Sequence, residues 1–496
     1  MNAYTFPTAT PESLGIPSKA VSDMLDAIRR EGVTLNSIQI IRYGKRCVEG
    51  YYAPYGPEDP HVCFSFTKSI TATAIGLLQS EGKISLEDKV ISFFPEDLPE
   101  EISENLAEMN IRHLLTMTCG HETEPRCRND YNWVKGFLAH PVKRKPGTFF
   151  VYNSVGSYML TAILRKVTGL NLTEYLKPRL FDKMGIEKVS CSKCPMGTEH
   201  GGGGMRMRPA DMAKMAQLWL NRGVWEGETL VDPAFIDEAT GIHIVQAEGW
   251  NPVKYPGMED YFSGYGYQNW RNTVPGSYRF DGMYGQLAMI LPKYDMIVLT
   301  TSATLRIYKI LNTVWRMLIP ALEAQALPED EAAQKALEEY LGRLSVDWTE
   351  TGCRVPGNEA LIEGRRILLP PNDCGILAPM GVKKGLESLK FSFGDNTAAL
   401  TLVQNGAEET VTLGLDGARV RSVLGGEEIA STANWTDENT LVLDLNQVNH
   451  VFHQTVTLKF GEFRQVDVTL YLTPNDCDIP TGSRYRPALT LKGTLE

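Results

Sequence analysis

A serine and a lysine three residues apart, Ser65 and Lys68, are the residues whose types and spacing could do chemistry together. The segment around them, 61–83, carries apolar residues at helical spacing and ends at Gly82, which predicts a helix with one buried face. On such a helix the two side chains lie on one face, one turn apart. A serine hydroxyl becomes a nucleophile when a neighbouring base takes its proton, and a buried, uncharged lysine is such a base. The pair is therefore a compact unit of nucleophile and base.

The same spacing occurs twice more, at Ser80–Lys83 and Ser190–Lys193, but only the first pair opens a long apolar helix. The alternative interpretation of Ser65 is a helix N-cap followed by a solvated lysine. The local string does not separate these two interpretations. The rest of the chain has to decide between them.

A second candidate is Tyr152, which lies in the string Tyr152-Asn153-Ser154 directly before an apolar helical segment. A tyrosine at a junction between loop and helix can present its hydroxyl to a cleft. Beside a cationic lysine its pKa is expected to fall, and it can then relay a proton. The alternative is a tyrosine that packs its ring and bonds its hydroxyl to the backbone.

Composition sets the class of protein. The chain has 496 residues, 43% hydrophobic and 22% charged, which predicts a globular protein of two to four domains. Its net charge of −11 argues against nucleic acid or an acidic membrane as a partner. No apolar run is long enough for a membrane span and no signal peptide is visible, so we expect a cytoplasmic protein. Nine scattered cysteines favour reduced thiols, and the single Cys191–Cys194 pair is a poor metal site.

The chain reads as an α+β region followed by an all-β region. A helix from Ser18 and a hairpin near 37–52 come first, and two apolar strands lie within 277–303. We place the first domain at 1–325 and a charged helical linker at 326–349. Alternating apolar residues and tight turns make 350–496 a separate C-terminal domain, a β-barrel or a β-sandwich.

Five strings, spread in order over the first 320 residues, carry a resemblance to a known family. They are FSFTKSITATAIGLLQSEGKISLEDKV, PGTFFVYNS, GGGGMRMRPADMAKMAQLWLNRG, YGYQNW and GMYGQLAMILPKYDMIVL. This region resembles the serine β-lactamase and penicillin-binding-protein superfamily, specifically the class C β-lactamase-like serine hydrolases. The resemblance implies an antiparallel sheet flanked by helices, an inserted all-α part, and an active site between them.

Carried over by position, the resemblance makes Ser65 the acylated nucleophile and Lys68 its base. Tyr152 corresponds to the tyrosine of the Tyr-x-Asn motif and passes protons to the leaving group, while Ser154 replaces the motif's asparagine and contacts substrate. The oxyanion hole is expected to use the Ser65 N–H and one N–H from 277–286, which counting places at Phe280. Two such donors stabilise the negative charge that develops on the carbonyl oxygen.

The same count places Ser277-Tyr278-Arg279 where true β-lactamases of this superfamily have Lys-Thr-Gly. The missing lysine and the missing asparagine at 154 argue against efficient β-lactamase activity. Arg279 could still bind a substrate carboxylate.

The favoured hypothesis is a serine hydrolase that acts through an acyl-enzyme on a small ester or amide, with no metal and no organic cofactor. One alternative is an acyltransferase that uses the same acyl-enzyme. A second alternative is a non-catalytic binding protein of the same fold. The C-terminal domain could cover the cleft, mediate a homodimer or stabilise the catalytic domain.

Overall fold

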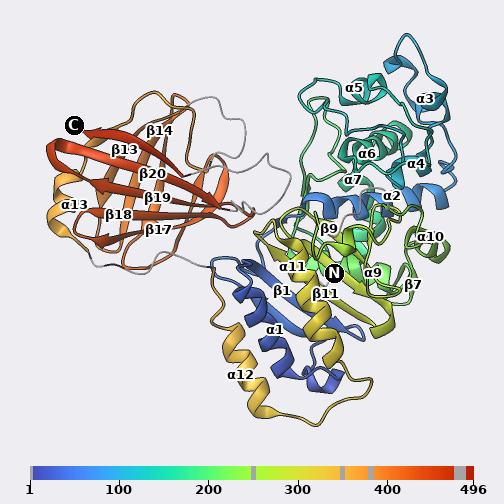
Figure 1. Ribbon diagram of the computed structural model, residues 1–496, viewed down its shortest axis with the longest axis horizontal. Coiled ribbons are helices and arrows are strands. Elements are labelled where there is room, and N and C mark those ends of the chain that lie inside the picture. Colours follow the sequence, from blue (N-terminus) through green and yellow to red (C-terminus); the bar gives the residue numbers. More distant parts are fainter. Residues whose placement is uncertain (1–3, 247–252, 347–351, 353, 378–384, 474–487) are drawn as a thin grey trace. The chain divides into compact units, whose positions relative to one another are not determined.

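The computed structural model describes residues 4–246, 253–346, 352, 354–377, 385–473 and 488–496 (Figure 1). The chain divides into two compact units. The first comprises Met1–Tyr51, Pro60–Ser302 and Ile307–Arg343, and the second comprises Tyr52–Asp59, Ala303–Arg306 and Leu344–Glu496.

The first unit contains a six-stranded antiparallel sheet in the order β2-β1-β11-β10-β9-β8. Its strands are β1 (Leu35–Arg42), β2 (Lys45–Tyr51), β8 (Trp270–Arg271), β9 (Tyr278–Gly282), β10 (Gln286–Leu291) and β11 (Met296–Ser302). Every residue of β1, β9, β10 and β11 is buried, so both faces of the central strands are covered. Helix α9 (Pro209–Leu220) packs on β10 and β11, and α1 (Ser18–Arg30) packs against α11 (Ile307–Thr313) and α12 (Glu331–Leu341).

A largely helical part is inserted between β2 and β8. Its helices are α2 (Thr67–Ser80), α3 (Glu104–Glu108), α4 (Ile111–Leu115), α5 (Trp133–Ala139), α6 (Ser154–Thr168), α7 (Leu172–Leu176), α8 (Asp182–Met184) and α10 (Pro233–Ala239). Short strands accompany them: β3 (His61–Val62), β4 (Ser190–Cys191), β5 (Met205–Met207), β6 (Val224–Trp225) and β7 (Glu228–Thr229). Helix α6 packs against α2, α4 and α5.

Helix α2 is the central helix of this unit, and it is buried more completely than its sequence indicates. The periodicity predicts one buried face, whereas every residue from Thr67 to Leu78 is buried. Its hydroxyl groups make this possible because they donate to backbone carbonyls: Ser69 to Gln268 at 2.7 Å and Thr71 to Gly201 at 2.9 Å. A polar residue on this helix is therefore not a sign of a solvated face.

Residues 326–349, predicted as a helical linker, contain α12, and this helix packs within the first unit. Gln334 Nε2 donates to Glu12 Oε2 at 3.0 Å, and the Tyr340 hydroxyl donates to Asp26 Oδ1 at 2.9 Å. The stretch up to Arg343 thus belongs to the first unit instead of standing apart as a linker.

The second unit is a closed β-barrel. Its strands are β12 (Arg366–Leu368), β13 (Leu386–Phe393), β14 (Thr397–Gln404), β15 (Ala407–Gly414), β16 (Val420–Leu424), β17 (Glu427–Asp437), β18 (Thr440–Gln447), β19 (His453–Phe460), β20 (Gln465–Thr473) and β21 (Leu489–Leu495), with one short helix, α13 (Pro356–Ile362). They follow the order β15-β14-β13-β12-β21-β20-β19-β18-β17-β16, and Gly414 of β15 also pairs with Thr432 of β17. This pairing joins the first strand of the order to the strand next to its last, so the barrel, and not the sandwich, is the correct alternative.

Eight residues from the first part of the sequence, Tyr52–Asp59, belong to the barrel unit. The Tyr55 hydroxyl donates to Asn446 Oδ1 at 3.0 Å, and Asp59 forms an ion pair with Arg421 at 2.7 Å. The predicted α+β class and the C-terminal all-β domain are confirmed, but this contribution from the N-terminal region was not expected.

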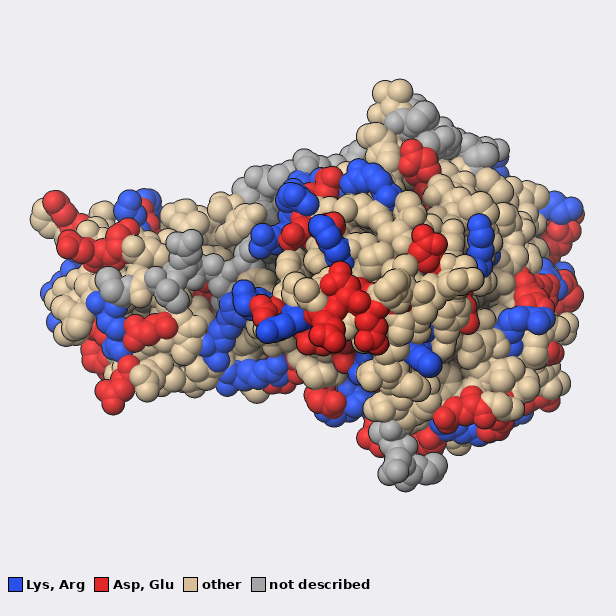
Figure 2. All heavy atoms as spheres, turned by 90° about the horizontal axis from the view of Figure 1, so that it is seen from below, with Lys and Arg blue, Asp and Glu red and all other residues tan. Residues whose placement is uncertain are grey.

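Charge on the molecular surface is mixed. On the face shown in Figure 2, acidic and basic side chains are interspersed, apart from one compact acidic group. This agrees with a net charge that is negative but modest for the chain length. Among the described residues, no helix combines the length and apolar character needed to cross a bilayer.

Candidate active site

Ser65 lies in a tight turn that connects β3 to α2. A short 3-10 helix, Phe64–Phe66, leads directly into α2, and Phe64 has a positive φ of 46°. A non-glycine residue in this conformation is uncommon and is typical of a constrained functional turn. The Phe64 ring contacts the ring of Tyr284, with centroids 5.3 Å apart. Within the part of the chain that the structure describes, the Ser65 N–H has no hydrogen-bond acceptor.

Lys68 is buried, with 1% of its surface exposed, and its amine lies within reach of three oxygen atoms. Nζ donates to Ser65 Oγ at 2.9 Å, to Ser154 Oγ at 3.1 Å and to the Gly202 carbonyl at 2.5 Å. Burial is the largest influence on the group and lowers its pKa to about 7, against opposing effects of the Glu124 and Asp281 carboxylates. The alternative of a solvated lysine is therefore wrong, because this lysine is held inside the protein next to Ser65.

Tyr152 lies immediately before α6, and its ring faces Lys68. The Lys68 Nζ atom is 4.8 Å from the ring centroid. Burial raises the pKa of Tyr152, and the nearby polar side chains of Ser65 and Trp270 only partly oppose this rise. The expectation that a cationic lysine lowers this pKa is wrong, because burial outweighs the other influences on the phenol and Lys68, with a pKa of about 7, is only half charged at neutral pH.

Ser154, the first residue of α6, connects Lys68 to a charged pair. Its hydroxyl accepts from Lys68, and its N–H donates to Glu124 Oε1 at 2.8 Å. Glu124 in turn pairs with Arg128 at 2.8 Å. The structure thus places the Ser154 hydroxyl against the Lys68 amine, while its expected contact with substrate stays a prediction.

A run of four glycines, Gly201–Gly204, provides the carbonyl that faces Lys68. A Cβ atom on Gly202 would lie 2.3 Å from the Ser154 carbonyl oxygen, so only glycine fits there. The sequence shows that this run permits a close backbone approach, but it does not show that the run approaches a lysine.

Arg279, considered from the sequence as a binding residue for a substrate carboxylate, is instead an internal residue. Its guanidinium is fully buried. Nε donates a hydrogen bond to Asp281 Oδ2 at 2.8 Å, and Nη1 donates to Asn272 Oδ1 at 2.8 Å. Nη1 also donates to two backbone carbonyls. These partners hold the side chain within the protein, so the expectation that Arg279 binds a substrate carboxylate is wrong.

Phe280 of β9 packs against the serine turn. Its buried ring packs edge-to-face on Phe66 and Trp219, with centroids 5.2 and 5.0 Å apart. Gly282 of β9 also meets the turn, because a Cβ atom there would lie 2.2 Å from the Cys63 carbonyl oxygen and 3.2 Å from the Phe66 nitrogen. Strand β9 thus lies against the serine turn at both residues, and the Phe280 N–H as the second oxyanion donor stays a prediction.

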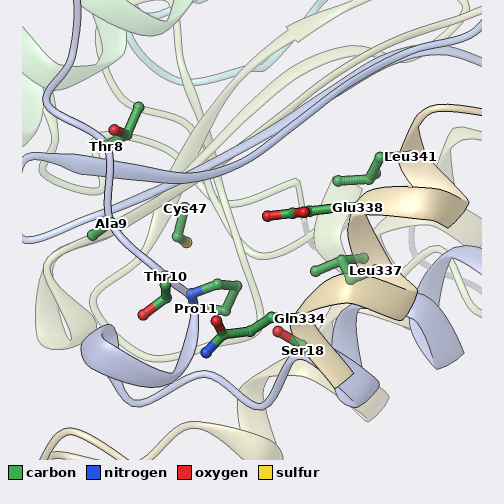
Figure 3. A pocket seen from close by; sticks show the side chains of 10 residues that line it. All are labelled: Thr8, Ala9, Thr10, Pro11, Ser18, Cys47, Gln334, Leu337, Glu338 and Leu341. Atoms are coloured by element: carbon green, nitrogen blue, oxygen red, sulfur yellow. The ribbon is translucent and has the colours of Figure 1, made fainter. Parts of the chain in front are cut away.

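Two other features of the first unit do not add to this site. Among the described residues, no group of three or more His, Cys, Asp or Glu side chains is arranged to hold a metal ion. A pocket of about 420 Å³ lies elsewhere in the first unit, where Cys47 of β2 and Glu338 of α12 point toward it (Figure 3). None of the predicted site residues lines this pocket, and burial raises the pKa of the Cys47 thiol to about 12, which keeps it unreactive.

A sheet flanked by helices, an inserted helical part and a buried Ser-Lys pair define a class of fold and site that known proteins share. Residues 18–306, more than half of the chain, match the Beta-lactamase family, and the chain belongs to this family of hydrolases.

Three relatives illustrate the similarity. The chain is 22% identical over 316 residues to a 6-aminohexanoate-dimer hydrolase of Paenarthrobacter ureafaciens, covering 60% of this chain and 80% of that protein. A putative 6-aminohexanoate-dimer hydrolase structure from Bacillus anthracis aligns with a TM-score of 0.52 at 19% identity, covering 66% of this chain and 89% of that one. EstCE1, described as a hydrolase with promiscuous acyltransferase activity, aligns with a TM-score of 0.50 at 18% identity, covering 61% and 99%. At these identities the structural alignments show the fold.

Proposed function

We propose that this chain is a serine hydrolase that forms an acyl-enzyme on Ser65 with a small ester or amide substrate. The observation that carries the proposal is the position of the Lys68 amine, which lies 2.9 Å from Ser65 Oγ in a buried environment that brings its pKa to about 7. A lysine in this state is half uncharged at neutral pH and can act as a general base.

The three oxygens around Lys68 suit the uncharged amine. A neutral amine has two N–H bonds and one lone pair. The Ser154 hydroxyl and the Gly202 carbonyl can accept the two N–H bonds, which leaves the lone pair directed at Ser65 Oγ. Lys68 then takes the Ser65 proton as Oγ bonds to the substrate's carbonyl carbon.

Tyr152 is the proposed proton donor to the leaving group. Its raised pKa keeps the phenol protonated at neutral pH, and its ring lies against the Lys68 amine, 4.8 Å from Nζ to the centroid, next to Ser65. The phenol proton passes to the leaving nitrogen or oxygen as the carbonyl re-forms, and the proton held by Lys68 then restores the phenol. Hydrolysis of the acyl-enzyme runs the same steps in reverse with water as the nucleophile.

The oxyanion would be held by the Ser65 N–H and by an N–H at the end of β9. The Ser65 N–H has no acceptor within the described part of the chain, so it is available. Gly282 supports this assignment, because it lies against the backbone of the serine turn. Loss of one such donor typically lowers the rate by ~10²–10³-fold.

The charge arrangement favours substrates without a carboxylate near the reacting carbonyl. The Arg279 guanidinium is occupied by Asp281 and buried, so it offers no cation to such a group. We therefore expect poor or no β-lactamase activity. A relative named a 6-aminohexanoate-dimer hydrolase aligns with 60% of this chain. This similarity motivates short linear amides as test substrates.

The test combines active-site labelling with a substrate panel. A fluorophosphonate probe should label the wild-type chain and not Ser65→Ala, and the same variant should lose turnover of nitrophenyl esters and short linear amides. Equal labelling and turnover in both proteins would contradict the proposal, and a binding protein would show neither. Product analysis with added alcohols or amines separates hydrolysis from acyl transfer to those acceptors.

A further inference from the structure

Glu124 is a carboxylate that lies next to the reacting groups and has one open oxygen. Its Oε1 atom accepts the Ser154 N–H at 2.8 Å and a hydrogen bond from Arg128 at 2.8 Å. The hydroxyl of the same Ser154 contacts the Lys68 amine, so a single residue separates Glu124 from the proposed base. Within the described part of the chain, no hydrogen bond reaches Oε2, and 37% of the side chain is exposed. This oxygen is therefore accessible to a ligand.

The carboxylate is held in place by its two partners. Ser154 is the first residue of α6, and the N–H groups of a helix's first turn have no acceptor within the helix. A carboxylate bonded there is also stabilised by the helix dipole. Arg128 occupies the other side of Oε1, but it is exposed at 44%, and such an exposed pair contributes little free energy. Both contacts fix Oε1 and leave Oε2 open.

Carboxylates, and not cations, are the accessible charges near the reacting groups. After burial, which is the largest influence on both pKa values, the charges of Glu124 and Asp281 act on Lys68 and on Tyr152. Asp281 is buried and already paired with Arg279 at 2.8 Å, so it is not available to a ligand. Of the two carboxylates, Glu124 is thus the one that can meet a charged group of the substrate.

We propose that Glu124 is a specificity-determining residue that binds an ammonium group of the substrate through Oε2, so that the preferred substrates are small esters or amides carrying a positively charged amine. A primary ammonium has three N–H donors and no acceptor, which matches an oxygen without a donor. Hydrogen bonds between an ammonium and a carboxylate are stronger than those between neutral groups. The inference rests on the proposed function and goes further by naming the charge of the substrate.

The test measures a selectivity: kcat/KM for a linear amide with a terminal ammonium, divided by kcat/KM for the amide with a methyl group in its place. Two such pairs of substrates are used, with the ammonium on the acyl half or on the amine half. The assays are run at about pH 8.5 and low ionic strength, where Lys68 is mostly uncharged and an alkyl ammonium keeps its charge. Because both substrates meet the same protein, a change in Lys68 or in the folded fraction cancels. The wild type should prefer the ammonium substrate in at least one pair.

Three variants make the comparison specific. Glu124→Gln removes the charge and keeps an oxygen that can accept the Ser154 N–H, and it should lower the selectivity by about 5- to 30-fold. Arg128→Gln removes a cation that repels the ammonium, so it should raise the selectivity by about two- to fivefold. Glu122→Gln is the matched control: Glu122 lies in the same stretch between α4 and α5, pairs with Arg144, and should leave the selectivity unchanged.

Salt provides a measurement that needs no variant, and it replaces Glu124→Gln if that protein does not fold. Added sodium chloride should lower the selectivity of the wild type, because salt screens an exposed pair of charges.

A wild type that prefers the uncharged substrate in both pairs would overturn the inference. So would equal selectivity in the wild type and Glu124→Gln, a lower selectivity in Arg128→Gln, or a wild-type selectivity that salt does not change. Failure of the proposed function is a separate outcome, in which Ser65→Ala keeps its turnover of both substrates.

Discussion

The exposed ion pair of Glu124 and Arg128 offers a direct way to shift the titration of Lys68. The two side chains are 2.8 Å apart, with 37% and 44% of their surfaces exposed, and Glu124 also accepts the Ser154 N–H. Their charges act on Lys68 in opposite directions: Glu124 raises its pKa and Arg128 lowers it. Substituting either one by glutamine should therefore move the pKa of Lys68 in opposite directions.

The size of the effect follows from Coulomb's law. At ~8 Å and an effective dielectric constant of ~40, one charge acts on Lys68 with ~1 kcal/mol, or ~0.7 pH units. The uncharged amine is the active form, so activity rises as the pH rises through the wild-type pKa of about 7. Glu124→Gln should move this limb to lower pH by ~0.7 units, and Arg128→Gln should move it to higher pH by ~0.7 units.

The assay is the pH profile of kcat/KM for a nitrophenyl ester, because this parameter reports groups of the free enzyme. Low ionic strength is needed, since salt screens exposed charges. Glu122→Gln is the matched control: Glu122 pairs with Arg144 in the same part of the chain and does not act on Lys68. The double variant Glu124→Gln/Arg128→Gln should return close to the wild-type midpoint.

Two results would refute this reasoning. The wild-type profile could lack an acid limb near pH 7, in which case Lys68 is not the titrating base. The two single variants could also shift the limb in the same direction, in which case the effect is structural and not electrostatic.

Three further predictions concern residues that lie around Ser65 and Lys68 or hold β9 in place. Gly282→Ala places a Cβ atom 2.2 Å from the Cys63 carbonyl oxygen, so it should lower kcat/KM by ~10²-fold in a folded protein; wild-type kinetics would exclude this end of β9 from the oxyanion hole. Arg279→Met leaves the Asp281 carboxylate buried without its partner, which should cost ~3–5 kcal/mol in urea unfolding, and adding Asp281→Asn should recover most of it. Ser154→Ala removes one acceptor from Lys68 and should lower kcat/KM by about tenfold, whereas Ser154→Thr keeps the hydroxyl and should stay close to wild type.

The sequence was sufficient for the local parts of the site. Ser65 and Lys68 are three residues apart on one helix, so their contact follows from helical geometry. Tyr152 and Ser154 are about 85 residues further along the chain. They could be assigned to the site of Ser65 and Lys68 only because the order of several strings resembles that of a known family. Alternation and turn residues were likewise sufficient for an all-β C-terminal domain, because strand periodicity is also a local signal.

The errors arose where the packing of side chains decides. The assignment of the Phe280 N–H as the second oxyanion donor is not among them and stays a prediction, because the packing of the ring does not fix what the backbone N–H contacts. Arg279 was a plausible anion site by residue type, and only the coordinates show Asp281 and Asn272 around it. The segment Tyr52–Asp59 joined the barrel unit without any signal in its composition, because such long-range contacts leave no local pattern.

The pKa of Tyr152 is a similar case. The sequence argument assumed a charged lysine as its neighbour, whereas burial acts on both groups and favours the uncharged form of each. The consequence is functional: the pair is better described as a neutral base and a neutral acid than as an ammonium beside a phenolate.

The central claim is that a covalent intermediate forms on one hydroxyl, and mass spectrometry tests it most directly. Wild-type protein is mixed with a slowly hydrolysed ester, quenched in acid during turnover, digested and mapped. The account predicts the added mass of the acyl group on the peptide that contains Ser65, and no added mass in Ser65→Ala. Two results would contradict it. One is turnover with the acyl group on another residue, and the other is the absence of any acylated peptide together with undiminished activity in Ser65→Ala.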